Sequence, residues 1–281
     1  MKLCRIGKLN EERPAIIDKN NNYRDLSLII KDLNPETLNF DILKKIMKTD
    51  ILKLPVLENK MRIGACISKP SKFIGIGLNF KDHAKEQNLP IPTEPIIFSK
   101  FTSSLSGPND DIIIPKNSKK TDWEVELGFV IGKRASYINE ADALNYVLGF
   151  FLVNDVSERE FQKNKGLTWD KGKGFDTFGP IGPYILTTDE LPDYQKLNMY
   201  LDVNGKRMQK GNTDQMIFNI KKLVSYMSHC MSLEPGDICC TGTPPGVGEN
   251  MKPPRFLKSG DIVKLGVDKL GEQNHKVKSL N

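Results

Sequence analysis

The chain has 281 residues, of which 38% are apolar, 8% aromatic and 27% charged. These values are typical of a globular protein and exclude a disordered, collagen-like or coiled-coil chain. The net charge is +6, but only 8 of the 41 basic residues are Arg, and acidic residues are interspersed among them. Nucleic-acid-binding proteins gather basic residues on one face and use Arg for bidentate contacts, so we expect no nucleic-acid partner.

Cysteine spacing and apolar run length indicate a cytoplasmic protein. The cysteines are Cys4, Cys66, Cys230, Cys239 and Cys240. Their odd number and the lack of a CxxC pair disfavour a zinc ribbon or a redox pair. Adjacent cysteines in an apolar strand are expected to point to opposite faces as small core residues. The longest apolar run, 147–153, is far shorter than the ~20 residues that span a bilayer. The first ten residues lack a signal-peptide core.

Residues 1–68 are predicted to form a small N-terminal domain. Three short segments, at 3–7, 14–18 and 22–27, have the composition of strands. Asn34 followed by Pro35 is a typical helix start, and the apolar residues that follow form a stripe as far as about residue 48. The remainder, 69–281, is predicted to be one catalytic domain.

Strand signals dominate the second domain. Segments rich in β-branched or aromatic residues lie at 73–79, 95–100, 111–115, 124–132, 146–155, 182–187, 196–210, 237–243 and 261–268. The Asn204-Gly205 pair predicts a type I′ hairpin. Only two helices are predicted, near 141–146 and at about 214–231. With so few crossover helices a Rossmann fold or TIM barrel is disfavoured, and a mostly β (α+β) fold remains, as a barrel, a sandwich or a rolled sheet.

Three carboxylates are candidates for a metal site. Glu124 and Glu126 lie two residues apart in a predicted strand and therefore share one face. Asp155 ends the next apolar strand. Carboxylates without a Cys or His partner suit a hard cation such as Mg²⁺ or Mn²⁺. The alternatives are a solvated strand edge for the glutamates and a cap of the following turn for Asp155.

His83 and Glu86 are candidates for a catalytic pair. If their segment is helical, the two side chains lie three residues apart on one face. A carboxylate beside an imidazole fixes the tautomer of the ring, which is what a general base needs. The alternative is an ordinary pair on the surface. The other histidines, His229 and His275, are given no role, because one lies beside an apolar helical stripe and the other in a polar tail.

Two glycine-rich segments could line a pocket. Lys173 lies between glycines in 169–180, and glycine lets a backbone approach a ligand closely; the alternative is an exposed lysine loop. The segment 241–248 lacks the GxxxxGK[ST] spacing of a phosphate-binding loop, but its backbone N–H groups could face a pocket.

Taken in chain order, these motifs resemble the fumarylacetoacetate hydrolase (FAH) family over about residues 73–277. The matching segments are GLNFKDHAKE, TDWEVELGFVIG, NDVSERE, GKGFDTFGPIGP, the Asn-Gly hairpin and LEPGDICCTGTPPGVG. The resemblance implies an FAH-type mixed β-roll around the active site, a small preceding domain and a homodimer. This chain has Phe80 where many relatives have Tyr, so a contact of that phenol is absent here.

The resemblance also implies a role for each candidate residue. The implied metal ligands are Glu124, Glu126 and Asp155, with Mg²⁺ or Mn²⁺ as the ion and Ca²⁺ as a further candidate. The implied catalytic residues are His83, Glu86 and Lys173. The implied substrate contacts are Arg159, Gln162 and Thr243.

The predicted function is metal-dependent hydrolysis of a C–C bond in a 2,4-dioxo acid, with release of pyruvate. Segments 107–110, 120–123 and 251–255 look most similar to the branch that acts on 2,4-diketo-3-deoxy-sugar acids, in which many members are labelled ureidoglycolate lyase. The alternative is a ureidoglycolate lyase or an oxaloacetate decarboxylase that uses the same metal site without hydrolytic water. A non-catalytic metal-binding scaffold is disfavoured, because it has no use for a general base.

Overall fold

The computed structural model describes residues 1–58, 60–166 and 168–280. The strands of its larger sheet are β1 (Lys2–Ile6), β2 (Arg13–Ile17), β3 (Tyr23–Asp25), β4 (Val56–Leu57), β5 (Phe73–Gly77), β6 (Ile96–Lys100), β10 (Val125–Ile131), β11 (Val147–Asn154), β14 (Ile185–Thr187) and β17 (Ile238–Cys240). Their order is β4-β3-β2-β1-β14-β11-β10-β17-β5-β6. The central pair, β10 and β11, is buried along its whole length.

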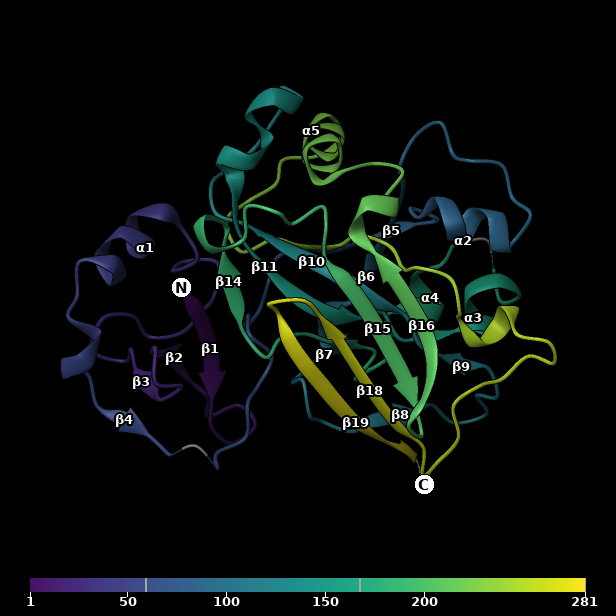
Figure 1. The fold of residues 1–281 in the computed structure, drawn as a ribbon, viewed down its shortest axis with the longest axis horizontal. Helices are drawn as coiled ribbons and strands as arrows, with labels where there is room; N and C mark the ends of the chain where they lie inside the picture. Colours follow the sequence, from purple (N-terminus) through teal and green to yellow (C-terminus); the bar gives the residue numbers. More distant parts are fainter. Residues whose placement is uncertain (59, 167, 281) are drawn as a thin grey trace.

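A second sheet has the order β16-β15-β18-β19-β8. Its strands are β8 (Ile112–Ile114), β15 (Asn198–Val203), β16 (Lys206–Asn212), β18 (Ile262–Val267) and β19 (Gly271–Ser279). Figure 1 shows this sheet, in green and yellow, lying across the central strands of the larger one, and the core fills the space between them. Two short pairs complete the strands: β7 (Leu105–Ser106) with β13 (Gly179–Pro180), and β9 (Thr121–Asp122) with β12 (Ser157–Glu158). The mostly β, α+β class is confirmed.

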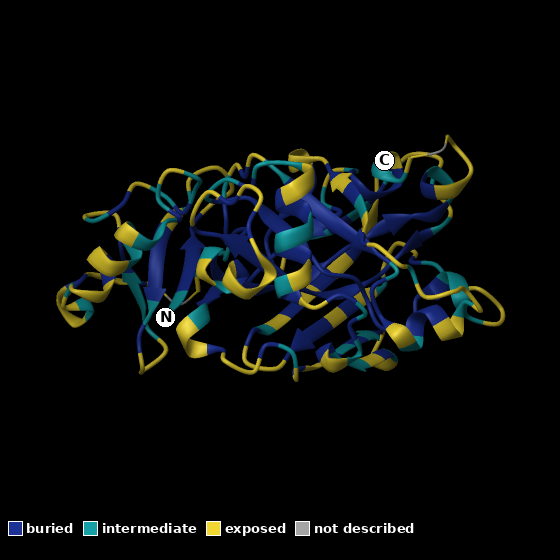
Figure 2. Ribbon diagram, turned by 90° about the horizontal axis from the view of Figure 1, so that it is seen from above, coloured by how far each residue is buried: buried dark blue, intermediate teal, exposed yellow. Residues whose placement is uncertain are grey.

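The helices are short and lie around the sheets. The α-helices are α1 (Phe40–Met47), α2 (Lys81–Glu86), α3 (Arg159–Lys163), α4 (Asp170–Lys173) and α5 (Ile220–Cys230). The 3₁₀ helices are Ile51–Lys53, Thr102–Ser104, Glu140–Tyr146, Thr188–Glu190, Thr213–Gln215 and Gly248–Asn250. Figure 2 shows that exposed residues gather on these helices and the loops, whereas the strands are mainly buried. Within the described ranges, none of the helices has the length and apolar character needed to cross a bilayer.

Two predicted helices begin later than expected. The helix α1 starts at Phe40, and its cap is Asn39, whose side chain accepts a hydrogen bond from Ile42 N at 3.0 Å. The predicted cap Asn34 instead closes a turn, accepting from the backbone of the second and third residues after it. The helix α5 starts at Ile220 rather than near residue 214, because Asn219 caps it.

The last strand was not predicted. Residues 271–279 form β19, and the expectation that His275 lies in a polar tail is wrong. Gln273, His275 and Val277 point inward and are fully buried, while the residues between them are exposed. The alternation is regular, but two of the three inward residues are polar and give no hydrophobic signal. The predicted hairpin between β15 and β16 is confirmed, with positive φ at both Asn204 and Gly205.

The N-terminal strands extend the main sheet. The strand β1 pairs antiparallel with β14, so residues 1–58 add four strands to the sheet that carries β10 and β11. Leu3 and Ile16 on one face of these strands join Phe151 and Val153 in one apolar cluster, whereas Cys4 belongs to the core cluster on the other face. The division of the chain near residue 68 stays a prediction.

Candidate active site

The three predicted carboxylates lie at one end of the central strand pair. In the antiparallel register of β10 and β11, Glu126 is opposite Val153, and the backbone N–H of Asp155 donates to Glu124 O at 2.9 Å. All three acids are buried, with exposed fractions of 7% for Glu124 and 1% for each of the others. The alternatives of a solvated strand edge and a simple turn cap are therefore not what the structure shows.

Lys173, at the end of α4, places its ammonium between two of these carboxylates. Its Nζ lies 2.8 Å from Glu124 Oε2 and 2.6 Å from Asp155 Oδ2. The side chain is 2% exposed, so it is not part of an exposed lysine loop. It also lies 5.1 Å from the ring centroid of Phe98, which forms part of the apolar wall beside it.

A second buried lysine was missed by the sequence analysis. Lys100 ends β6, and its Nζ lies 2.6 Å from Asp155 Oδ1 and donates to the backbone carbonyls of Lys173 and Val156. It has no measurable exposure as a side chain. No local signal marked it, because β6 is an edge strand of the sheet, where a lysine is ordinary, and its partners come from distant segments.

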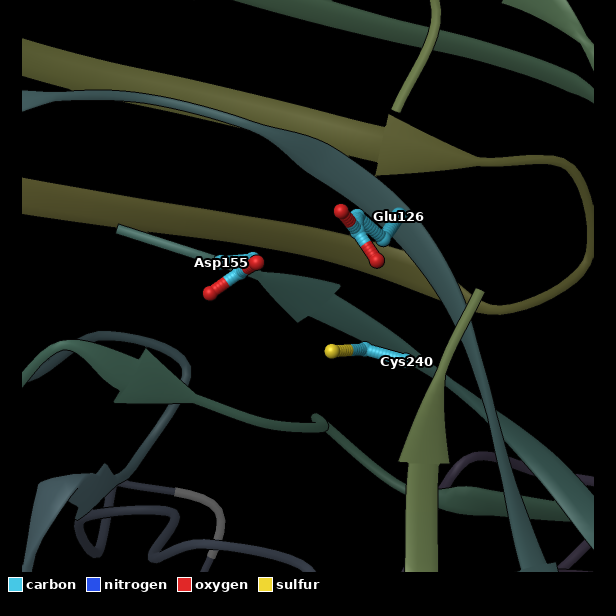
Figure 3. Close-up of side chains that lie close together, drawn as sticks. All are labelled: Glu126, Asp155 and Cys240. Carbon is cyan, nitrogen blue, oxygen red and sulfur yellow. The ribbon is translucent and has the colours of Figure 1, made fainter. Parts of the chain in front are cut away.

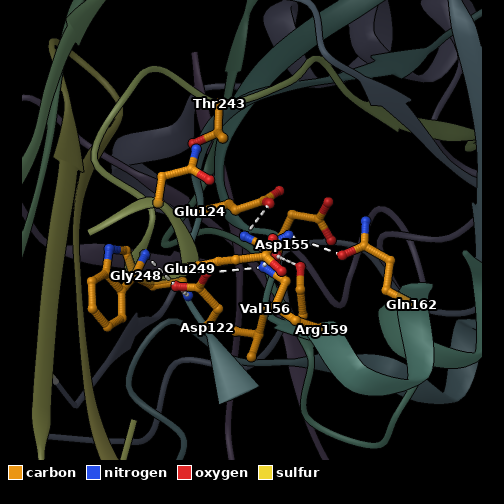
Figure 4. A network of polar contacts seen from close by, with 12 residues as sticks. Asp122, Glu124, Asp155, Val156, Arg159, Gln162, Thr243, Gly248 and Glu249 are labelled. Carbon is orange, nitrogen blue, oxygen red and sulfur yellow. Dashed lines mark hydrogen bonds and ion pairs between the residues drawn. The ribbon is translucent and has the colours of Figure 1, made fainter. Parts of the chain in front are cut away.

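Arg159, the first residue of α3, contacts two buried carboxylates, one of them in the cluster. Its Nη2 lies 2.7 Å from Glu124 Oε1 and its Nε lies 2.9 Å from Asp122 Oδ2, as Figure 4 shows. Its Nη1 donates to Gln162 Oε1 at 3.0 Å. Thr243 also lies in this region, but its hydroxyl donates to Val125 O at 2.9 Å.

Burial and neighbouring charges shift the pKa values of these groups. Burial would raise the pKa of Glu124, but Lys173 and Arg159 hold it well below its usual range. The pKa of Glu126 is raised well above its usual range, first by burial and then by the charges of Asp155 and Glu124. Burial would lower the pKa of Lys173, but Asp155 and Glu124 raise it. Among the described residues, Glu126 is thus the carboxylate of this cluster that forms no ion pair.

His83 and Glu86 form the predicted pair on α2. His83 Nδ1 lies 2.9 Å from Glu86 Oε2, and Gln87 Nε2 lies 2.7 Å from His83 Nε2. A carboxylate can only accept, so Nδ1 carries the ring proton and the lone pair of Nε2 accepts from the Gln87 amide. Burial would raise the pKa of Glu86, but hydrogen bonds from His83 and Asn250 leave it lowered. Glu86 therefore stays ionised and orients the ring.

A cavity of about 220 Å³ brings the two groups together. Its polar lining consists of His83, Gln87, Glu124, Glu126, Arg159, Gln162, Lys163, Lys173, Thr243 and Glu249. Its apolar lining includes Ile76, Leu78, Leu89, Ile96, Phe98, Trp169 and Val247. Eight of the predicted site residues are at or directly behind this lining, and Glu86 reaches it through His83. Gln87 and Trp169 are further residues that the sequence analysis did not assign.

The donor set fits a divalent cation, with one difference from the predicted ligands. In the described part of the chain, one group of donors lies within 4.8 Å of one another: Glu126, Asp155 and Cys240 (Figure 3). Glu124 is not in this group, since its oxygens face Arg159 and Lys173. Two buried carboxylates of like charge repel each other unless a cation lies between them, and Glu126 has no ion pair among the described residues.

The motif order and the geometry agree with one enzyme family. The family model described as fumarylacetoacetate (FAA) hydrolase C-terminal matches residues 72–278. The chain belongs to the FAH family. A Burkholderia ambifaria protein, described only as a hydrolase, is 55% identical to it over 274 residues, which is 97% of each chain.

Solved structures of FAH proteins superpose on the whole chain. The fumarylacetoacetate hydrolase of Exiguobacterium antarcticum has a TM-score of 0.88 and 30% identity, with 100% of both chains covered. The maleylpyruvate hydrolase of Sphingobium sp. SYK-6, in complex with manganese(II) and pyruvate, has a TM-score of 0.84 and 26% identity, again with 100% of both chains covered. Isomerases of this fold are also similar, such as that of Mycobacterium abscessus, described as a 2-hydroxyhepta-2,4-diene-1,7-dioate isomerase, with a TM-score of 0.84 and 30% identity over 100% of both chains. The chain is thus an enzyme of the FAH family, as predicted.

Proposed function

We propose that this protein is a divalent-metal-dependent hydrolase that cleaves the C3–C4 bond of a 2,4-dioxo acid and releases pyruvate. The observation that carries the proposal is one cavity that joins a cluster of buried carboxylates to the oriented His83–Glu86 pair. The related maleylpyruvate hydrolase, whose structure holds manganese(II) and pyruvate, supports a pyruvate-binding site in this fold.

The cluster around Glu126 and Asp155 would hold the ion, with Glu124 beside it. Mg²⁺ and Mn²⁺ suit these oxygen donors, and Ca²⁺ is a further candidate. When bound, the ion supplies positive charge that polarises the 2-oxo group of the substrate. The anionic end of the substrate is bound by Lys173 and Arg159, two of the three cationic side chains that line the cavity in the described structure.

Proton transfer is the role proposed for His83. Its Nε2 takes a proton from water once the amide of Gln87 moves aside, and the carboxylate of Glu86 stabilises the imidazolium that forms. The water oxygen bonds to C4 at the same time. General-base catalysis of this kind contributes about 10²–10⁴ in rate.

Bond cleavage places new negative charge beside Lys173. As the C3–C4 bond breaks, its electron pair moves to C3 and gives the enolate of pyruvate, while C4 leaves as a carboxylic acid. The Lys173 ammonium stabilises the enolate oxygen, an effect worth about 3 kcal/mol per well-placed donor. The imidazolium of His83 returns its proton to C3, which restores the neutral ring for the next turnover.

An assay of pyruvate release tests the proposal. The purified protein is incubated with a panel of 2,4-dioxo acids, after chelation and after addition of Mg²⁺ or Mn²⁺. We expect pyruvate and one equivalent of the matching acid only with the ion present. Full activity after verified metal removal contradicts the metal requirement, and no turnover of any dioxo acid contradicts the substrate class.

The proposed substrate within this class is a 2,4-diketo-3-deoxy-sugar acid, with a hydroxyl at C5. A pocket that hydrogen-bonds this hydroxyl rejects the analogue without it, because its own polar groups are then unpaired. Polar side chains at the cavity, Gln87, Gln162 and the Lys163–Glu249 pair, are available for such a bond. We expect a higher kcat/KM for 2,4-diketo-3-deoxy-L-rhamnonate or -fuconate than for acetylpyruvate; equal values contradict this choice.

A lyase or decarboxylase is the second candidate function. It is favoured by the hydrogen bond between Gln87 and His83 Nε2, which occupies the atom that would activate water. Oxaloacetate and ureidoglycolate are therefore assayed on the same preparation. Urea release or decarboxylation, without cleavage of any dioxo acid, would move the assignment to this class.

We also propose a cytoplasmic homodimer. All five cysteines lie in the described ranges and are free thiols, which supports a reducing compartment. Phe101 and Leu280 are about half exposed at the edge of an apolar hollow, a feature that a subunit contact would cover. Light scattering at micromolar concentration checks the assembly, and a monomer there contradicts it.

A further inference from the structure

Lys163 and Glu249 form an ion pair at the cavity lining, which the function proposed above uses only as a source of hydrogen bonds. Lys163 is the last residue of α3, and Glu249 lies in the 3₁₀ helix Gly248–Asn250. Lys163 Nζ lies 2.5 Å from Glu249 Oε2. Figure 4 shows Glu249 in the polar network that also contains Asp122 and Arg159. The pair therefore links two segments that both contribute to the lining.

Exposed fractions indicate which end of the cavity opens to solvent. The side chains of Lys163 and Glu249 are 45% and 26% exposed, whereas that of Lys173 is 2% exposed. The proposed binding of the anionic end by Lys173 and Arg159 places that end of the substrate on the buried side. The part of the substrate beyond C4, which we call the tail, therefore points toward the open end, where Lys163 and Glu249 lie.

In the described part of the lining, no cation is left unpaired for a charged tail. Lys173 and Arg159 already contact buried carboxylates and are the groups proposed to bind the anionic end of the substrate. Lys163 is the third cation of this lining, and Glu249 offsets its charge. Glu249 Oε2 also lies 3.8 Å from Arg159 Nε. A tail with its own carboxylate would therefore lie beside Glu249 and compete with it for Lys163.

Five further lining residues, outside the carboxylate cluster, are uncharged. Gln87 and Thr243 are polar, and Leu89, Ile96 and Trp169 are apolar. A carboxylate placed among these groups would lose part of its hydration without gaining a cation, which is costly. A tail that carries hydroxyl or amide groups loses much less, because such groups are uncharged in water as well.

We propose that Glu249 is a specificity-determining residue that restricts the site to 2,4-dioxo acids with an uncharged tail. By neutralising Lys163 it removes the remaining cation of the described lining that could bind a second carboxylate, and its own charge repels that carboxylate. The hydroxyl groups of an uncharged tail can donate to Glu249 and accept from Lys163. This inference rests on the proposed function, because it concerns the substrate of the same site.

The test compares two substrates that differ only in the charge of the tail. They are 2,4-dioxoheptanedioate and its C7 amide, which have nearly the same size and the same C3–C4 bond. Cleavage of either compound releases pyruvate, together with succinate from the diacid and succinamate from the amide. We expect the parent protein to have a kcat/KM about tenfold or more higher for the amide. The difference should lie mainly in KM, because the end of the tail is remote from the bond that breaks.

Glu249→Gln should remove this preference. The substitution keeps the size of the side chain but leaves Lys163 without its carboxylate. We expect kcat/KM for the diacid to rise about tenfold, while that for the amide changes by less than about threefold. Adding Lys163→Met should abolish the gain. The control is Glu160→Gln, which removes a carboxylate of the same helix α3 that pairs with Lys120 at 2.8 Å outside the cavity lining. It should leave the ratio of the two substrates within about twofold.

Binding measurements separate the inference from the proposed function. Titration calorimetry with His83→Ala and Mn²⁺ gives the dissociation constants of both compounds without turnover. Equal affinities, tighter binding of the diacid, or a preference that Glu249→Gln leaves unchanged overturns the inference and leaves the proposed function intact. Failure of both compounds to bind, while other dioxo acids are cleaved, also overturns it, because the amide has the uncharged tail that it requires. No binding and no turnover of any dioxo acid overturns the proposed function itself.

Discussion

Two networks of buried charge in this molecule have similar composition but differ in how the charges are paired. The first, which we call the seam network, links segments of residues 1–68 to one another and to the loop before β8. Arg5 contacts Asp32 at 2.6 Å and Glu12 at 3.3 Å, and Arg62 contacts Glu12 at 2.7 Å and also Asp110. Each carboxylate of the seam network thus touches a guanidinium.

The second network is the cluster of buried charges in the candidate active site. There, not every carboxylate of the described structure has a cationic partner. Lys100, Lys173 and Arg159 all contact Asp155 or Glu124. Glu126, in the same cluster, forms no ion pair with a cation of the described chain, and the charges of Asp155 and Glu124 affect its pKa more than that of Lys173 does.

The pKa values of Asp32 and Asp110 in the seam network shift in the opposite direction from that of Glu126 in the candidate active site. Burial would raise the pKa of Asp32 and Asp110, but their arginine partners leave both lowered. Burial raises the pKa of Glu126, and the neighbouring carboxylates raise it further. Removing one partner of the paired network would leave an uncompensated charge, whereas Glu126 is already without an ion pair in the described structure and is where the proposed ion would add positive charge.

The largest expected effect comes from Glu126→Gln. The neutral amide can keep the hydrogen bond from Gly242 but cannot replace a charged ligand, so we expect metal binding and activity to be lost. The metal-free variant should melt no lower than the metal-free parent, and about 2 °C higher for each 1 kcal/mol of repulsion removed. Differential scanning calorimetry with and without Mn²⁺ checks both statements. A lower melting temperature in the absence of metal would show that Glu126 is paired after all.

His83→Ala tests whether catalysis can be lost without disturbing the charge network. His83 contacts Glu86 and Gln87 but none of the three cluster carboxylates in the described structure. We expect kcat to fall by about 10²–10⁴ with an unchanged Mn²⁺ affinity, measured by titration calorimetry. Cleavage of a dioxo acid at the parent rate would refute the general-base role.

Arg5→Met tests the stabilising role of the seam network. Its side chain is only 10% exposed, and its removal leaves Asp32 without its guanidinium partner. Breaking such a buried pair costs about 3 kcal/mol, which urea unfolding measures, while kcat of the folded variant stays at the parent value. The control is Lys44→Met, which removes an exposed pair with Asp41 and should cost less than about 0.5 kcal/mol. Equal costs for the two variants would contradict the distinction drawn here.

The smallest expected effect is on acid stability in Arg62→Met. The pKa of Asp110 is lowered in the folded protein, so below about pH 4 the unfolded chain binds more protons and stability falls as the pH falls. Without Arg62 the pKa of Asp110 returns toward its usual value, and this acid-dependent loss becomes smaller, by up to about 1 kcal/mol. Unfolding curves at pH 3 to 6 give the slopes. A steeper acid loss in the variant would reverse the sign of the argument.

The sequence predicted which residues lie in the candidate site better than it predicted how their charges are paired. The two-residue spacing of Glu124 and Glu126 is a local pattern that strand geometry turns into a shared face. Asp155 joins them because β11 pairs with β10, which the family resemblance implied and local spacing did not. The three-residue spacing of His83 and Glu86 is equally local, and their contact follows from one turn of helix. The two spacings needed no knowledge of the tertiary structure.

The missed features depend on which strands become neighbours. Cys240 and Lys100 reach the cluster only because β17 lies beside β10 and β6 ends next to the turn at Asp155. Nothing within a few residues of either side chain indicates that neighbour. The strand β19 was missed for a different reason, since its inward residues Gln273 and His275 are polar and satisfied by hydrogen bonds inside the protein.

The loop at 241–250 has a consequence for how this enzyme can be altered. Three of its backbone N–H groups, those of Gly242, Gly246 and Gly248, donate to Glu126, Glu86 and Asp122 respectively. The proposed metal ligand Glu126, the proposed base partner Glu86 and the Arg159 partner Asp122 are thus held by backbone groups. Side-chain substitutions leave these hydrogen bonds in place only while the loop keeps its path. Variants that change the size of the cavity are therefore better placed at Ile96 and Trp169, which line the cavity but do not belong to this loop.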